Sequence, residues 1–124
     1  MKYKMIQRVN PQDRSQVKQY AAPVNDGRVT KSDIAKELAL TSSLSRGDVS
    51  NVIENLIDVI PKYLLMGKSV NLGEFGTLRL SFSSEGVEDA GEFNVNKIHG
   101  VKVVFTPSSE FKTVLKSLKF EKSV

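Results

Sequence analysis

The sequence contains no cysteine, no tryptophan and one histidine among its 124 residues. Without cysteine, neither a disulfide framework nor a thiolate metal site is available. His99 has no second histidine to complete a metal site, so we expect no metal and no cofactor. The absence of cysteine is typical of a reducing compartment, and we expect a cytoplasmic protein.

Long hydrophobic runs are also missing. Nowhere do about 18 apolar residues follow one another, as a membrane span requires, and the amino terminus has no signal-peptide core. The sequence shows no G-x-S-x-G elbow, no phosphate-binding loop and no dinucleotide fingerprint. We therefore expect a binding protein that is not an enzyme and has neither a membrane partner nor a small-molecule substrate.

Charge is present in both signs but is unevenly spread. Lysine and arginine number 18 against 14 aspartates and glutamates, a net charge of +4. Residues 1–30 and 97–124 are both basic, whereas residues 85–92 carry four carboxylates and no cation. The basic ends favour an acidic partner, while the acidic segment would repel phosphate.

The first part of the chain predicts a hairpin followed by two helices. Residues 2–9 and 17–24 alternate partly between apolar and polar side chains around a stretch rich in turn formers, which predicts a β-hairpin. Thr30-x-x-Asp33 and Ser45-x-x-Asp48 have the capping form that begins a helix. The first helix should be short, and the second should run to Gly67.

The second part predicts strands followed by a helix. Strands should start at Val70 and at Thr77, and a returning strand should run from Phe93 to Phe105. A final helix should begin at Thr106-Pro107, since proline is favoured in the first turn. This order indicates an α+β fold. The broad apolar stripe of the long helix exceeds what one small subunit covers, which favours a symmetric homodimer.

Several segments together carry a family resemblance. The segments 30–35, 44–49 and 70–78, and the triplet 105–107, occur in the order seen in the bacterial HU and integration host factor family. From residue 29 onward the chain resembles this family of histone-like proteins. The resemblance implies an intertwined homodimer with two N-terminal helices, a three-stranded antiparallel sheet extended into a β-arm, and a C-terminal helix.

The resemblance also implies a domain organisation. Residues 1–28 would form an N-terminal β-hairpin extension, similar to HU-like variants of Bacteroidetes-type bacteria, and residues 29–124 an HU-like DNA-binding domain. Such a protein is expected to bind double-stranded DNA without sequence specificity, through phosphate contacts, in DNA condensation at the nucleoid. By position, the candidates for DNA contact are Lys31, Arg46, Arg79, Lys97, Lys102, Lys112 and Lys116.

The arm departs from the family pattern. The family has arginines and an Arg-Asn-Pro tip whose proline wedges between base pairs, but residues 83–92 contain neither proline nor arginine. Little intercalative bending is therefore expected. An alternative is that the chain is a structural or protein-interaction module that kept the HU scaffold after losing DNA binding. The extra hairpin could be an added strand, a dimer contact or a DNA contact, and the sequence does not rank these.

Overall fold

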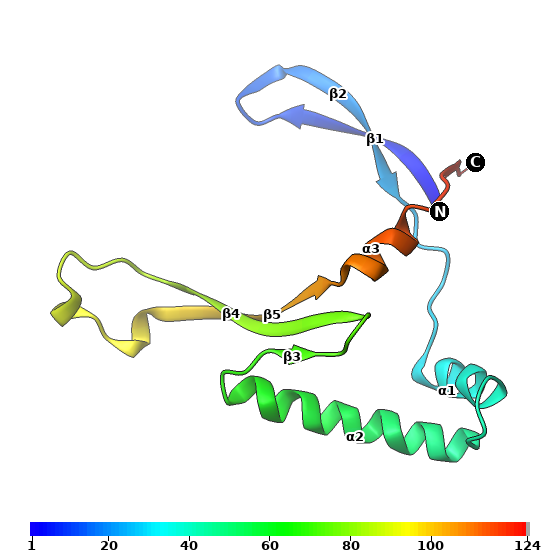
Figure 1. Cartoon of the computed structure of the whole chain (residues 1–124). Coiled ribbons are helices and arrows are strands. Elements are labelled where there is room, and N and C mark those ends of the chain that lie inside the picture. Colours follow the sequence, from blue (N-terminus) through cyan, green and yellow to red (C-terminus); the bar gives the residue numbers. More distant parts are fainter. Residues whose placement is uncertain (124) are drawn as a thin grey trace.

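The computed structural model describes residues 1–123, which form three α-helices and two three-stranded sheets (Figure 1). This confirms the predicted α+β fold. In chain order the elements are β1 (Lys2–Asn10), β2 (Asp13–Pro23), α1 (Lys31–Leu40), α2 (Arg46–Leu65), β3 (Val70–Asn71), β4 (Gly76–Ser84), two 3-10 helices (Ala90–Glu92 and Val95–Lys97), β5 (Ile98–Pro107), α3 (Ser109–Leu115) and β6 (Glu121–Lys122).

The predicted N-terminal hairpin is confirmed. Strands β1 and β2 pair antiparallel, from Tyr3 opposite Pro23 to Val9 opposite Val17. An additional strand, β6, pairs parallel with the first residues of β1. The terminal amino group also donates a 2.7 Å hydrogen bond to the carbonyl of Lys119. The segment after α3 therefore anchors the hairpin. This contact was not predicted, because a strand of two residues leaves no pattern in the sequence.

Both predicted helix starts are confirmed as complete capping boxes. The hydroxyls of Thr30 and Ser45 accept the backbone N–H of Asp33 at 3.2 Å and of Asp48 at 3.1 Å. In return, each carboxylate accepts the N–H of its capping residue. The predicted stop at Gly67 is also confirmed, because α2 ends just before this glycine, whose φ of 79° few other residues adopt.

Strands β3, β4 and β5 form the second sheet, and β4 and β5 extend from it as an arm (Figure 1). The prediction that the returning strand begins near Phe93 is wrong, because β5 begins at Ile98. The side chains of Asp89 and Asn94 each accept an N–H two residues on and start the two 3-10 turns. These local bonds compete with strand pairing at the end of the arm.

The predicted start of the last helix is also wrong. Pro107 still belongs to β5, opposite Gly76, and α3 begins at Ser109. The Ser108 hydroxyl caps the helix by accepting the N–H of Phe111 at 3.0 Å. Helix α3 ends at Leu115, so the apolar residues beyond it are not on a helical face.

Three phenylalanines join the turn before β4, the end of β5 and α3. The ring centroid of Phe75 lies 4.9 Å from that of Phe105 and 5.5 Å from that of Phe111. Phe105 and Phe111 meet edge to face at 6.1 Å. Gly76 lies beside this cluster, and a Cβ atom there would come within 2.4 Å of the Thr106 carbonyl oxygen. This aromatic cluster forms the root of the arm.

The buried core of a single chain is very small. Among residues 1–123, the buried apolar side chains are those of Ala35, Val49 and Leu64. Apolar side chains on α2, including Val52 and Ile57, remain more than half exposed. The chain exposes 10558 Å², whereas a compact monomer of this mass exposes roughly 6,600 Å². No helix within residues 1–123 has both the length and the apolar character needed to cross a membrane.

Candidate nucleic-acid interface

Two predicted cations lie on one face of the arm. Arg79 on β4 is opposite Val104, and Lys102 on β5 is opposite Ser81. Because residues two apart on a strand share a face, Arg79 and Lys102 are diagonal neighbours. Both side chains are exposed, and neither has a carboxylate within salt-bridge distance among residues 1–123. The two positive charges are therefore available to an anion.

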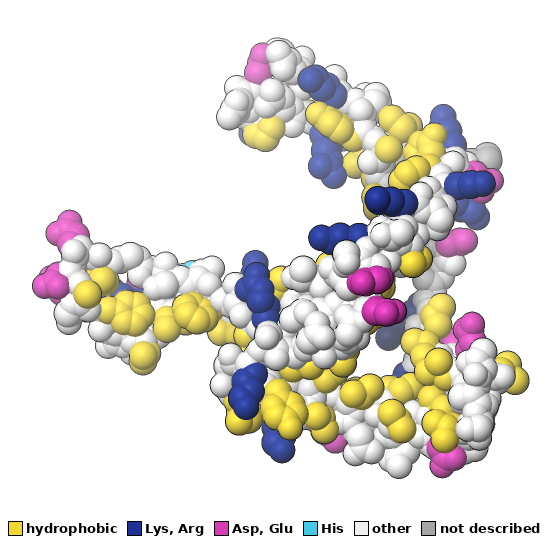
Figure 2. Space-filling model, viewed as in Figure 1, with side chains coloured by type: hydrophobic (Ala, Val, Ile, Leu, Met, Phe, Trp, Pro, Cys, Tyr) yellow, Lys and Arg dark blue, Asp and Glu magenta, His cyan; other side chains and the backbone are white. Residues whose placement is uncertain are grey.

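Helix α3 supplies a second pair of cations. Lys112 lies within the helix and Lys116 is its C-cap residue, one helical turn later. Side chains four residues apart lie on the same side of a helix. Both are exposed and form no ion pair with any residue that the structure describes. Figure 2 shows lysine and arginine side chains along the concave side of the molecule, from the N-terminal hairpin past α3 to the base of the arm.

Two other candidates have their charges paired. The Lys31 ammonium contacts the Glu54 carboxylate and so links the start of α1 to α2. The Lys97 ammonium lies 3.8 Å from the Glu85 carboxylate at the far end of the arm. Each partner offsets part of the positive charge that a phosphate would otherwise meet.

Arg46 is the first residue of α2 and is exposed. The helix starts are less open to phosphate than the sequence suggests, because each capping box occupies two backbone N–H groups, those of the capping residue and of the aspartate. They also place a carboxylate there. The pKa of Asp33 is lowered, first by the N–H of Thr30 and then by its hydroxyl, so this carboxyl stays charged at the start of α1.

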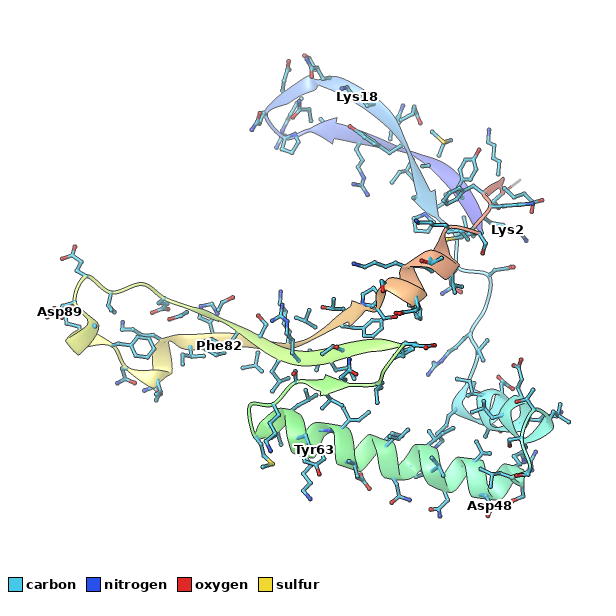
Figure 3. The ribbon with its side chains drawn as sticks, viewed as in Figure 1. Lys2, Lys18, Asp48, Tyr63, Phe82 and Asp89 are labelled. Atoms are coloured by element: carbon cyan, nitrogen blue, oxygen red, sulfur yellow. The ribbon has the colours of Figure 1, made fainter. Side chains whose placement is uncertain are left out.

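The far end of the arm is acidic. Figure 3 places Asp89 there, and Figure 2 shows acidic side chains gathered at the same end. We define the acidic tip as Glu85, Glu88, Asp89 and Glu92, which all lie between β4 and β5. The arm therefore carries positive charge near its root and negative charge at its end.

In the sequence, residues 1–30 are basic, but none of them was named as a candidate contact. Arg8 and Lys18 are opposite each other in the β1–β2 hairpin. The Arg8 guanidinium lies 5.9 Å from the centre of the Tyr20 ring. The alternation of residues in the predicted hairpin could have placed these side chains on one face. Among residues 1–123, no group of three metal-binding side chains is gathered.

The two helices, the sheet with its arm and the exposed basic side chains define an HU-domain protein. The family model HU-HIG, described as an HU domain fused to wHTH, Ig, or a glycine-rich motif, matches residues 1–122. The chain belongs to this family, which confirms the resemblance noted in the sequence. This is not an enzyme family, so the prediction of a protein without enzymatic activity is confirmed.

A solved structure supports the fold. The chain is similar to a protein from Bacteroides vulgatus described as a "Putative bacterial DNA binding protein", with a TM-score of 0.62 and 16% sequence identity. The similarity covers 98% of this chain and 47% of that one, so the chain spans about half the length of its structural neighbour. No curated protein matches the chain significantly.

Proposed function

We propose that the protein is a histone-like, nucleoid-associated protein that binds double-stranded DNA as a homodimer. Binding would be non-sequence-specific and made through phosphate contacts, and would serve DNA condensation. Residues 29–124 would form the HU-like DNA-binding domain and residues 1–28 its hairpin extension. Membership of the HU-HIG family supports the proposal, as does the description of the similar Bacteroides protein as DNA-binding.

The observation that carries the proposal is a set of exposed cations that form no ion pair with residues 1–123. Arg79 and Lys102 share one face of the arm, and Lys112 and Lys116 share one side of α3. Lysine and arginine side chains that neutralise phosphates provide most of the affinity in sequence-independent DNA binding. We propose these four residues and Arg46 as the main contacts, with Lys31 and Lys97 contributing less because each already faces a carboxylate.

The homodimer is supported by the exposed surface of the single chain. That surface is roughly 4,000 Å² larger than a compact monomer of this mass would expose. The arm and the hairpin project from the body and add to this area (Figure 1). Helix α2 also exposes apolar side chains to solvent. A second copy covering α2 would bury them in an interface of the size found in obligate dimers.

Little bending by intercalation is proposed, because the tip of the arm has no residue suited to it. A wedge between base pairs requires an apolar side chain or a proline presented without nearby negative charge. Here the end of the arm carries Glu88 and Asp89, and residues 83–92 contain no proline. Contacts near the root of the arm would leave the duplex close to straight.

Fluorescence anisotropy with a labelled duplex of mixed sequence, titrated at several salt concentrations, tests the proposed function. We expect micromolar binding whose logarithm falls linearly with the logarithm of salt concentration, by about 0.9 for each phosphate contact. A second duplex of unrelated sequence should bind equally. Absence of binding even at low salt would reject the proposal.

A paired variant tests the proposed surface on α3. Lys112→Glu with Lys116→Glu should weaken binding strongly without changing the mass of the dimer in solution. The matched control is Lys36→Glu with Lys62→Glu, which makes the same change of charge on α1 and α2. Equal loss of affinity in both variants would place the contact surface elsewhere.

The acidic tip favours one alternative function, that of a protein-interaction module on an HU scaffold. Four carboxylates at the end of a projecting arm suit a basic protein partner better than DNA. Under this alternative, the protein would not bind duplex DNA even at low salt. It would instead capture protein partners from a nuclease-treated lysate, and a variant with neutral side chains at the tip would not capture them.

A further inference from the structure

The N-terminal hairpin has two different faces. In the register of β1 and β2, Lys4, Arg8 and Lys18 lie on the same face, together with Tyr20 and Ile6. The opposite face carries mostly apolar side chains and the glutamine pair at positions 7 and 19. Because residues alternate between faces along a strand, the register of β1 and β2 gathers these basic residues on one face of the hairpin.

Three cations of this face form no ion pair with residues 1–123. Within residues 1–123, the ion pairs of the chain involve Lys2, Lys31 and Lys97, and none involves Lys4, Arg8 or Lys18. The nearby carboxylate of Asp13 instead accepts hydrogen bonds from the hydroxyl and the N–H of Ser15. The face therefore presents unneutralised positive charge to solvent.

Arg8 is held in place by its neighbours. Its guanidinium lies over the exposed ring of Tyr20, at 5.9 Å from the ring centre. The arginine also lines a surface hollow with Lys18 and Asn10 on the same side of the hairpin. A guanidinium supported by an aromatic ring keeps its hydrogen-bond donors free and loses less conformational freedom on meeting a phosphate.

The hairpin is also placed next to the proposed DNA surface. Strand β6 and the bond from the terminal amino group to Lys119 tie the hairpin to the segment that follows α3. The hairpin and the arm leave opposite ends of α3 and project to the same side (Figure 1). Basic side chains line the concave side between them (Figure 2). A duplex lying on α3 would pass within reach of the hairpin.

We propose that the face formed by Lys4, Arg8, Lys18 and Tyr20 is a second contact surface for the phosphate backbone of double-stranded DNA. This inference rests on the proposed function and adds to it a role for the hairpin. The partner is identified by charge. Lys4, Arg8 and Lys18 form no ion pair with residues 1–123, and the carboxylates near this face, those of Glu121 and Asp26, lie at its Lys2 end. Three cations along one face fit a polyanion such as the phosphate backbone.

Two variants of the hairpin test this inference. The first, Arg8→Gln with Lys18→Gln, removes one cross-strand pair of cations. The second adds Gln7→Arg and Gln19→Lys to these changes. It keeps the composition and net charge of the wild type but moves the pair to the opposite face. Lys36→Gln with Lys62→Gln, on the helices, controls for charge lost elsewhere.

The readout is the salt dependence of duplex binding by the full chain, with circular dichroism and solution mass as checks of fold and assembly. Both hairpin variants should bind more weakly, with a salt slope reduced by about 0.9 for each lost contact. The control on the helices should keep the wild-type slope. If the double variant does not fold, Lys18→Gln alone should give the smaller reduction.

The outcomes separate the inference from the proposed function. If the wild type binds DNA and the first variant binds identically, the hairpin is not a DNA contact. If the face-exchanged variant binds like the wild type, only net charge matters and the inference is overturned. A change in solution mass with an unchanged slope would identify a dimer contact instead and would also overturn it. A wild type that binds no duplex would reject both proposals.

Discussion

The chain carries two β-hairpins of similar length, β1–β2 and β4–β5, and they differ in how they are held and how they are charged. The β4–β5 arm is rooted by three packed phenylalanines, and its end is acidic. The β1–β2 hairpin is tied by a two-residue parallel strand and has a basic face. Within residues 1–123, the arm has its unpaired cations, Arg79 and Lys102, near the root, whereas the β1–β2 hairpin carries Arg8 and Lys18 farther from α3.

This comparison separates a structural role from an electrostatic one. The position of an arm is set by its root, where ring packing and close backbone contacts fix the angle at which it leaves the body. Its affinity for phosphate depends instead on the charges near its end, which a few exposed substitutions reverse. A chain can therefore keep an arm in place while a basic face is carried by a different hairpin.

The largest effect is expected at the root of the arm. Gly76→Ala should lower stability by at least about 2 kcal/mol, because a side chain is strained at its φ of 148° and the new Cβ would collide with the Thr106 carbonyl and the Phe105 ring. Gly86→Ala, at the open end of the arm, should change stability by less than about 0.5 kcal/mol. Urea denaturation measures both, and equal midpoints would contradict this view of the root.

The next effect concerns the acidic tip. Glu88→Gln with Asp89→Asn should tighten duplex binding, since each carboxylate about 10 Å from a phosphate costs roughly 0.4 kcal/mol in water. Removing two gives about fourfold at low salt and less at high salt, where the repulsion is screened. Anisotropy titrations at two salt concentrations measure this change.

The control for the tip variant is Glu37→Gln with Asp58→Asn, which makes the same change of charge on α1 and α2. If the control tightens binding as much as the tip variant, the gain comes from net charge and the tip does not face DNA.

A smaller difference is expected between two arm cations. Lys97→Gln should leave the salt slope of DNA binding nearly unchanged, because Glu85 already lies 3.8 Å from the ammonium. Arg79→Gln, which removes a cation that forms no ion pair with residues 1–123, should reduce the slope by about 0.9. Titration of both variants against one duplex compares them directly, and a larger loss for Lys97→Gln would mean that the tip reaches the DNA.

The sequence predicted the elements that depend on local signals. The capping boxes at Thr30 and Ser45, the glycine stop after α2 and the alternation of the first hairpin all act within a few residues, and all are confirmed. The family segments added the order of the remaining elements. The helix signals were strong because each satisfies backbone groups that would otherwise lack hydrogen-bond partners.

Features that depend on distant residues were missed or misplaced. Pro107 was expected to start α3, but pairing with Gly76 on β4 keeps it in the sheet and Ser108 becomes the cap. The pairing of Lys31 with Glu54 links residues 23 positions apart and left no mark in the sequence. The candidate contacts were proposed by position in the family, which could not distinguish paired from unpaired cations.

The smallest effect is a change in one titration at the turn of the β1–β2 hairpin. The pKa of Asp13 is lowered, first by the hydroxyl of Ser15 and then by its N–H. A lowered pKa means that the charged carboxyl stabilises the turn at pH values above the unfolded value of about 3.8. That contribution is lost as the pH falls through the lower, folded value.

Ser15→Ala removes the hydroxyl donor but keeps the N–H, so the pKa of Asp13 should rise part of the way toward its ordinary value. NMR titration of the Asp13 side chain measures the shift, and Ser83→Ala in the arm serves as the control. Above about pH 5 the turn should be less stable in Ser15→Ala than in the wild type, and the difference should shrink in acid. An unchanged pKa would show that the N–H of Ser15 alone lowers the pKa of Asp13. The serine hydroxyl would then have no part in keeping this carboxylate away from the basic face of the hairpin.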